Sequence, residues 1–221
     1  MTRASALVFD FDGTILDTET PEFEEWRAAF RERGHDLGLD VWQHSIGTVG
    51  AYDPCAHLAE LSGPVFDRDA LRQEVVARHT ARCESQPLLP GVVDRLREGR
   101  AAGLGTAVAS SSPSDWVEGW LERHALRDLF DAVCTRDHVA RVKPAPDLFL
   151  LAAQRLGAVP GACVVFEDSP NGISAARASG MPSVAIPNPL TRHLPMGDAD
   201  LVLGSLADHP LAEILRRLGL R

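Results

Sequence analysis

Two acidic residues stand two positions apart in segment 9–14, which reads FDFDGT. Residues two apart on a strand face the same side, so Asp10 and Asp12 could reach one site. Gly13 lets the chain turn sharply after them. In open α/β sheets, ligands bind at the carboxyl ends of the strands, which is where this pair would lie. An isolated pair of this kind more often belongs to an ordinary turn. Its interpretation therefore depends on which other residues lie at the same edge of the sheet.

A second acidic pair, Glu167 and Asp168, follows another apolar run and precedes Ser169 and Pro170. Serine followed by proline is typical of a helix start. The simpler interpretation is that the two acids only stabilise that helix N-terminus. If they meet the first pair, however, four carboxylates repel one another, and a hard cation bound by oxygen ligands relieves the repulsion. We expect Mg²⁺ in that role.

Three serines and a proline, at positions 110–113, join an apolar run to an expected helix. Hydroxyl and backbone N–H groups at such a junction can hold an anion. We expect Ser112 to be the helix cap, which is an ordinary structural role. Ser110, nearer the end of the strand, is then free to bind a phosphate oxygen, with Ser111 beside it.

Lys143 is the only lysine of the chain, because the other 21 of its 22 basic residues are arginine. An ammonium group is a compact point charge that can contact a carboxylate and a phosphate oxygen together, unlike the broad guanidinium group. A chance lysine on a solvated loop is the alternative. The segment 142–147, which reads VKPAPD and precedes an expected helix, favours a specific role.

The elements that must position these residues are apolar runs of strand length, expected at 6–11, 105–109, 163–166 and 183–186. Helical patterns separate the runs. This alternation predicts an α/β fold, a Rossmann-like parallel sheet flanked by helices.

Residues 18–87 differ from the rest because they lack a convincing buried strand and show helical spacing, as in Phe23, Trp26 and Phe30. We interpret them as an inserted α-helical cap domain, with hinges at Thr18 and at 87–90. The catalytic core is then made of residues 1–17 and 88–221.

The composition limits the possible partners. The chain has 221 residues, is 45% hydrophobic and carries a net charge of −9, which suits a globular core and disfavours nucleic acid as a partner. Its apolar runs are far shorter than the roughly 20 residues that span a bilayer, and no targeting pattern is visible. We therefore expect a cytoplasmic protein, a monomer or weak homodimer, whose four scattered cysteines are reduced.

The motifs together resemble the haloacid dehalogenase superfamily, in the helical-cap subfamily that includes β-phosphoglucomutase and phosphoglycolate phosphatase. DFDGT, a serine after the second strand, KPAPD and FEDSPNGI occur in the family's order over essentially the whole chain. The resemblance implies that Asp10 is the nucleophile and Asp12 the acid/base. It also implies that Asp10, the backbone of Asp12, Asp168 and Glu167 bind Mg²⁺, and that Ser110, Ser111 and Lys143 hold the phosphate.

The expected function is Mg²⁺-dependent hydrolysis of a small phosphorylated metabolite through an aspartyl-phosphate on Asp10. Dehalogenases of the superfamily do not need Asp12, so this residue favours phosphate as the substrate group. A phosphomutase of the β-phosphoglucomutase type is the closer alternative. Such mutases have a cap histidine four residues after the hinge threonine, where this chain has Glu22, and a basic residue where it has the neutral loop 46–50. A scaffold without catalysis is a third alternative.

Overall fold

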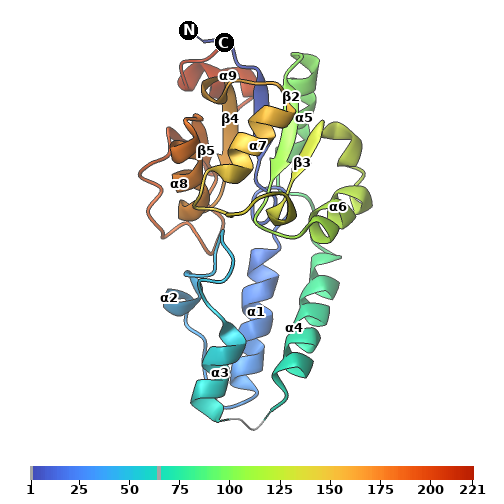
Figure 1. Cartoon of the computed structure of the whole chain (residues 1–221), viewed down its shortest axis with the longest axis vertical. Coiled ribbons are helices and arrows are strands. Elements are labelled where there is room, and N and C mark those ends of the chain that lie inside the picture. The colour runs from blue at the N-terminus through green and yellow to red at the C-terminus, as the bar shows by residue number, and fades with distance from the viewer. Residues whose placement is uncertain (1, 64–65) are drawn as a thin grey trace.

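The computed structural model describes residues 2–63 and 66–221. Within these residues, a parallel sheet of six strands has the order β3-β2-β1-β4-β5-β6 (Figure 1). The strands are β1 (Ala6–Phe9), β2 (Gly105–Ala109), β3 (Ala132–Cys134), β4 (Cys163–Glu167), β5 (Ser183–Ala185) and β6 (Leu201–Val202). Helices flank the sheet, so the predicted Rossmann-like α/β fold is confirmed.

Strand β2 has the expected limits, and β4 and β5 end within one residue of theirs, but β1 and the number of strands differ more. Strand β1 ends at Phe9 and does not continue to Phe11, because the carbonyl of Phe11 accepts backbone hydrogen bonds from Ile15 and Leu16 in a tight loop. Strands β3 and β6 were not expected at all. They have three and two residues, which is too short for an apolar run to stand out from its surroundings.

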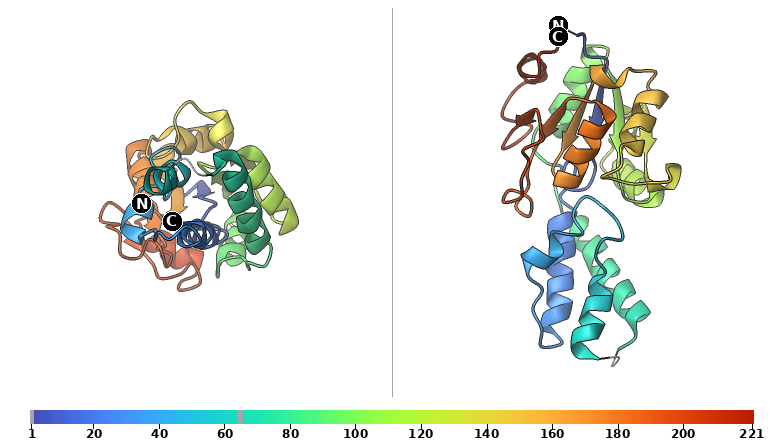
Figure 2. Two further views of the ribbon diagram at one scale, coloured as in Figure 1. Left: turned by 90° about the horizontal axis from the view of Figure 1, so that it is seen from below. Right: turned by 60° about the vertical axis from the view of Figure 1, so that its left-hand side comes forward.

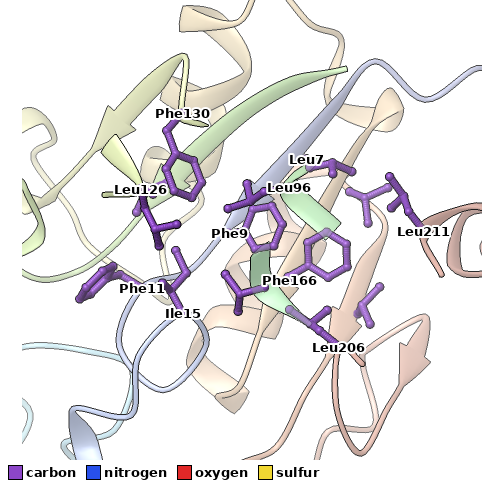
Figure 3. Close-up of a cluster of buried hydrophobic side chains, with 14 of the residues drawn as sticks. Leu7, Phe9, Phe11, Ile15, Leu96, Leu126, Phe130, Phe166, Leu206 and Leu211 are labelled. Carbon is purple, nitrogen blue, oxygen red and sulfur yellow. The ribbon is translucent and has the colours of Figure 1, made fainter. Parts of the chain in front are cut away.

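Side chains alternate across the sheet and fill a hydrophobic core on each face. Leu7 and Phe9 of β1 pack with Phe166 of β4 on one face, which Figure 3 shows together with Leu96 of α5. Ala6 and Val8 point to the opposite face. The flanking helices are α5 (Val92–Ala101), α6 (Ser114–Arg123), α7 (Asp147–Arg155), α8 (Pro170–Ser179) and α9 (Leu211–Arg217), with short 3₁₀ turns η1 (Arg127–Leu129), η2 (Arg136–His138) and η3 (Pro160–Ala162).

A helical segment lies beyond the carboxyl ends of the strands, at the end of the molecule opposite to the two termini (Figures 1 and 2). It has its own core, in which Phe23, Trp26 and Phe30 are buried as their spacing predicts. Its helices are α1 (Glu19–Arg31), α2 (Leu39–Trp42), α3 (Pro54–Ser62) and α4 (Arg68–Cys83).

The two chain segments that join the helical segment to the sheet run side by side. Leu16 forms an isolated antiparallel bridge with Leu88, and the backbone N–H of Leu89 donates to the carbonyl of Ile15 at 3.0 Å. The two connecting segments are therefore hydrogen-bonded to each other close to the end of β1.

The helix starts are partly as expected. Ser169 caps α8, because its hydroxyl oxygen accepts from the backbone N–H of Gly172 at 3.1 Å. The prediction that Ser112 caps α6 is wrong. That helix begins at Ser114, whose N–H donates to Oδ2 of Asp137 at 2.7 Å, and the hydroxyl of Ser112 is engaged elsewhere.

All four cysteines are free and buried, as expected. Over residues 2–63 and 66–221, no helix is both long enough and apolar enough to cross a membrane.

Candidate active site

The two acidic motifs meet because β1 and β4 are neighbours in the sheet. Phe9 pairs with Phe166, and the N–H of Asp10 donates to the carbonyl of Phe166 at 2.9 Å. One carboxylate oxygen from each of Asp10, Glu167 and Asp168 lies within 4.8 Å of the others, and all three residues are buried. The side chain of Asp12 is not part of this cluster.

Lys143 lies against this cluster, although it comes from the loop between β3 and α7. Its ammonium group donates to Oδ1 of Asp10 and, at 2.6 Å, to Oε1 of Glu167. Only 1% of its surface is exposed, so the alternative of a solvated loop lysine is wrong. Burial alone would lower the pKa of Lys143, but the two carboxylates raise it above the usual value, which keeps the ammonium charged.

Glu167 has both of its oxygens engaged within the protein. Oε1 accepts from Lys143, and Oε2 accepts from the backbone N–H groups of Asp168 and Ser169, each at 2.9 Å. A Cβ atom at Gly172 would lie 1.8 Å from this carboxylate, so only glycine leaves room for it. Glu167 therefore orders the start of α8 and holds Lys143 at the same time.

The side chain of Asp168, the residue after Glu167, points into the same acidic cluster. Its Oδ2 accepts from the side-chain amide of Asn188 at 2.7 Å, and that amide also lies 3.4 Å from Oε2 of Glu19. A Cβ atom at Gly13 would lie 2.5 Å from Asp168 Oδ2, and Gly13 has a positive φ of 82°. Gly13 thus serves both the turn after Asp12 and the close approach of Asp168.

Asp12 is held by four hydrogen-bond donors on the side of the site that faces the helical segment. Oδ1 accepts from the hydroxyl of Thr18 at 2.7 Å and from the indole N–H of Trp116 at 2.9 Å. Oδ2 accepts from the hydroxyls of Ser112 at 2.6 Å and Ser110 at 3.2 Å. These four hydrogen bonds fix the orientation of the Asp12 carboxylate.

The carboxylates of the acidic cluster are in an environment that disfavours their charge. Burial, which Lys143 only partly offsets, raises the pKa of Asp10 to about 8, with further contributions from Glu167 and Asp12. Burial followed by repulsion from Glu19 and Glu167 raises the pKa of Asp168 well above its usual value. Buried carboxylate oxygens that repel one another are the donor set that a hard divalent cation such as Mg²⁺ prefers, so these residues fit that ion.

A cavity of about 340 Å³ opens above Asp10 and Asp12. Its other walls come from the helical segment and from the loops after β2 and β3. The lining includes Thr18, Glu19, Glu22, Ser45, Gly47, Thr48, Val49, Val76, His79, Ser111, Ser112, Pro113, Trp116 and Arg136. Asp10, Asp12 and Ser111 therefore line one cavity.

Several residues of the site escape sequence reasoning. Trp116 and Asn188 touch Asp12 and Asp168, respectively, yet each lies in a helix or loop without a distinctive pattern. His79 contacts the carbonyl of Thr18 through Nε2 at 2.9 Å and tilts against the ring of Trp116, with 5.1 Å between ring centroids. Of the missed residues, only Glu19 could have been suspected from the sequence, because it lies next to the expected hinge at Thr18.

The comparisons with known proteins agree with this geometry. A family model described as haloacid dehalogenase-like hydrolase matches residues 4–180. The protein YhcW of Bacillus subtilis (strain 168) is 43% identical over 213 residues, covering 96% of this chain and 97% of YhcW. Fructose-1-phosphate phosphatase YqaB of Escherichia coli (strain K12) is 41% identical over 189 residues, covering 83% of this chain and 97% of YqaB.

A solved structure extends the likeness to three dimensions. CbbY from Rhodobacter sphaeroides in complex with xylulose-(1,5)-bisphosphate has a TM-score of 0.78 and 27% identity, covering 95% of this chain and 98% of that chain. The chain therefore belongs to the haloacid dehalogenase-like hydrolase family, and within it to the phosphoric monoester hydrolases.

Proposed function

We propose that the chain is a Mg²⁺-dependent phosphatase that transfers the phosphoryl group of a small phosphomonoester to Asp10 and then to water. The observation that carries this proposal is the buried group of Asp10, Asp168 and Lys143 at the end of β1. Two unit charges 4 Å apart repel by about 4 kcal/mol at an effective dielectric constant of 20, and a carboxylate that attacks a phosphate dianion must overcome about twice that repulsion. The positive charges of Mg²⁺ and Lys143 beside Asp10 would offset this repulsion.

Asp10 and Asp168 would bind the ion through their side chains and Asp12 through its backbone carbonyl, while Glu167 would support the site through Lys143. The bound Mg²⁺ would neutralise the charge on the phosphate oxygens and hold the phosphorus close to Asp10. Lys143, Ser110 and Ser111 would bind the remaining phosphate oxygens. Positioning and electrostatic stabilisation of this kind account for most catalysis of phosphoryl transfer.

Asp12 would donate a proton to the leaving alcohol and then accept one from the attacking water. It is two residues from Asp10 and lines the same cavity, where a leaving group would lie. Two of its four donors, the hydroxyls of Ser110 and Ser112, can rotate towards other acceptors, which would release Oδ2 for these transfers.

Residues 18–87 would act as a cap over residues 1–17 and 88–221, with the paired segments at Leu16 and Leu88 as the hinge. Closure of such a cap would exclude bulk water from the phosphoryl transfer. Water as the final acceptor is favoured over a second sugar hydroxyl, because the cavity wall carries Glu22 where mutases of the β-phosphoglucomutase type have a histidine. The substrate would be a small phosphorylated metabolite, in line with the names of the similar proteins.

The test is hydrolysis of p-nitrophenyl phosphate with and without Mg²⁺. We expect activity that requires Mg²⁺, disappears with a chelator and is lost in Asp10→Asn. Asp94→Asn, which changes an exposed aspartate at the start of α5, is the matched control and should retain full activity. Metal-independent hydrolysis, or an active Asp10→Asn variant, would disprove the proposal.

A further inference from the structure

The cavity above Asp10 contains a carboxylate that the phosphoryl transfer does not use. Glu22 lies in the first turn of α1, and its side chain lines the same cavity as Asp10 and Asp12. The backbone N–H of Glu22 donates to the carbonyl of Thr18 at 3.3 Å, but among the described residues none forms a hydrogen bond or an ion pair with its side chain. Its carboxylate oxygens are therefore available to a molecule bound in the cavity.

This position is unfavourable for an unpartnered charge. Burial, followed by repulsion from Asp12, raises the pKa of Glu22 to about 7. Glu22 is partly buried, so its carboxylate has lost part of its hydration, and a bound hydrogen-bond donor would offset that cost. The site thus favours a ligand that brings a hydrogen-bond donor or a positive charge to Glu22.

The other titratable groups on the same walls do not supply that partner. Glu19 is acidic, and its pKa is raised by burial and by Asp12. His79 has its pKa lowered by burial, and its Nε2 faces the carbonyl of Thr18. The part of the cavity that α1 and α4 form is therefore neutral or negative.

Arg136 is the one cationic side chain that lines the cavity among the described residues, and it comes from η2 on the sheet side. Its side chain is 44% exposed, and its Nε atom lies 3.7 Å from Oδ1 of Asp137. Solvent screening and this neighbouring carboxylate weaken its attraction for an anion. The more enclosed Glu22 should then dominate the choice of leaving group.

We propose that Glu22 selects the alcohol part of the substrate. It accepts a hydrogen bond from a hydroxyl or amino group of the leaving alcohol, and it disfavours leaving groups that carry a carboxylate or a second phosphate. The preferred substrates are thus monophosphates of polyols, sugars or amino alcohols. This inference rests on the proposed phosphatase function, since it concerns the leaving group of that reaction.

A matched pair of esters tests this selection. Glycerol 3-phosphate and 3-phosphoglycerate differ only in a CH₂OH group in place of a carboxylate, and p-nitrophenyl phosphate gives the reference rate. We expect the wild-type protein to prefer glycerol 3-phosphate by at least about 10-fold in kcat/KM, the effect of one lost hydrogen bond to a charged group. Glu22→Gln keeps the shape and removes the charge, so it should reduce this preference by about 10-fold, chiefly by improving 3-phosphoglycerate.

Two further variants separate the possible causes. Glu60→Gln changes an exposed glutamate of α3 and should leave the preference unchanged. Arg136→Gln should change it less than Glu22→Gln does. If either ester is hydrolysed too slowly, its inhibition constant against p-nitrophenyl phosphate replaces kcat/KM in the comparison.

An unchanged preference in Glu22→Gln would overturn the inference. So would a wild-type preference for 3-phosphoglycerate that Arg136→Gln abolishes, because Arg136 would then select an anionic leaving group. Either result would leave the phosphatase function intact as long as p-nitrophenyl phosphate is hydrolysed with Mg²⁺. Absence of that hydrolysis would instead disprove the phosphatase function, and the inference with it.

Discussion

The indole N–H of Trp116 donates a hydrogen bond of 2.9 Å to Oδ1 of Asp12, which joins helix α6 to the loop that follows β1. The same ring tilts against His79 of α4, so Trp116 contacts both the sheet domain and the helical segment. Together with Thr18, it holds one oxygen of Asp12 in place. A residue of this kind should affect catalysis through the position of Asp12.

Trp116→Phe should reduce kcat by about 3- to 10-fold with little change in KM, because it removes one hydrogen bond worth about 1 kcal/mol and keeps most of the ring. Steady-state kinetics with p-nitrophenyl phosphate measure both constants. Trp120→Phe is the matched control, since Trp120 packs beside Trp116 but makes no hydrogen bond to Asp12. Equal losses of kcat in the two variants would show that only packing matters.

Lys143→Ala should abolish most activity and also destabilise the protein by about 3–5 kcal/mol, because it leaves the buried carboxylates of Asp10 and Glu167 without their cation. Urea unfolding and kcat measure the two effects. Arg141→Ala, two residues away on the same loop and 71% exposed, should change the free energy of unfolding by less than about 1 kcal/mol. A Lys143→Ala variant with near-normal turnover would contradict the assigned role.

Mg²⁺ should bind more tightly as the pH rises from 6 to 9. The pKa of Asp10 is raised to about 8 and that of Asp168 is raised as well, so at lower pH protons occupy the oxygens that the ion needs. Calorimetric titration at several pH values measures the apparent Kd. Asp168→Asn should weaken binding at every pH, whereas a pH-independent Kd in the wild-type protein would show that these carboxylates are not the ligands.

Gly172→Ala should lower both stability and activity, because its Cβ atom would lie 1.8 Å from the carboxylate of Glu167 and displace the partner of Lys143. Gly119→Ala is the control. Gly119 lies within α6 with open space around it, so alanine should stabilise the helix by about 0.5–1 kcal/mol. Thermal unfolding and kcat of both variants give the comparison, and a harmless Gly172→Ala would mean that Glu167 can relocate freely.

The parts of the site that follow strands were predictable from the sequence. Asp10 and the pair Glu167 and Asp168 each follow an apolar run, and parallel neighbours bring such positions to one edge. Lys143 stood out because it is the only lysine of the chain. Local pattern and composition were sufficient in these cases.

Other parts depend on tertiary packing that no local pattern encodes. Ser112 looked like a helix cap, yet its hydroxyl bonds to Asp12 across 100 positions of the chain. Trp116 reaches Asp12 only because α6 packs against the loop after β1, and Asn188 reaches Asp168 from a loop without a motif. The short strands β3 and β6 are likewise defined by their neighbours in the sheet.

The most direct test of the central claim is to trap the phosphorylated enzyme. Asp12→Asn removes the group that would activate water, whereas p-nitrophenolate can leave without the proton that Asp12 would give to an ordinary alcohol. After mixing with p-nitrophenyl phosphate and Mg²⁺ and quenching in acid, this variant should therefore accumulate a phosphoryl group on the peptide that contains Asp10. Peptide mass spectrometry identifies the modified residue, and Asp10→Asn should show none. A phosphoryl group on another residue such as Ser110, or none in an Asp12→Asn variant that still releases the alcohol, would contradict nucleophilic catalysis by Asp10.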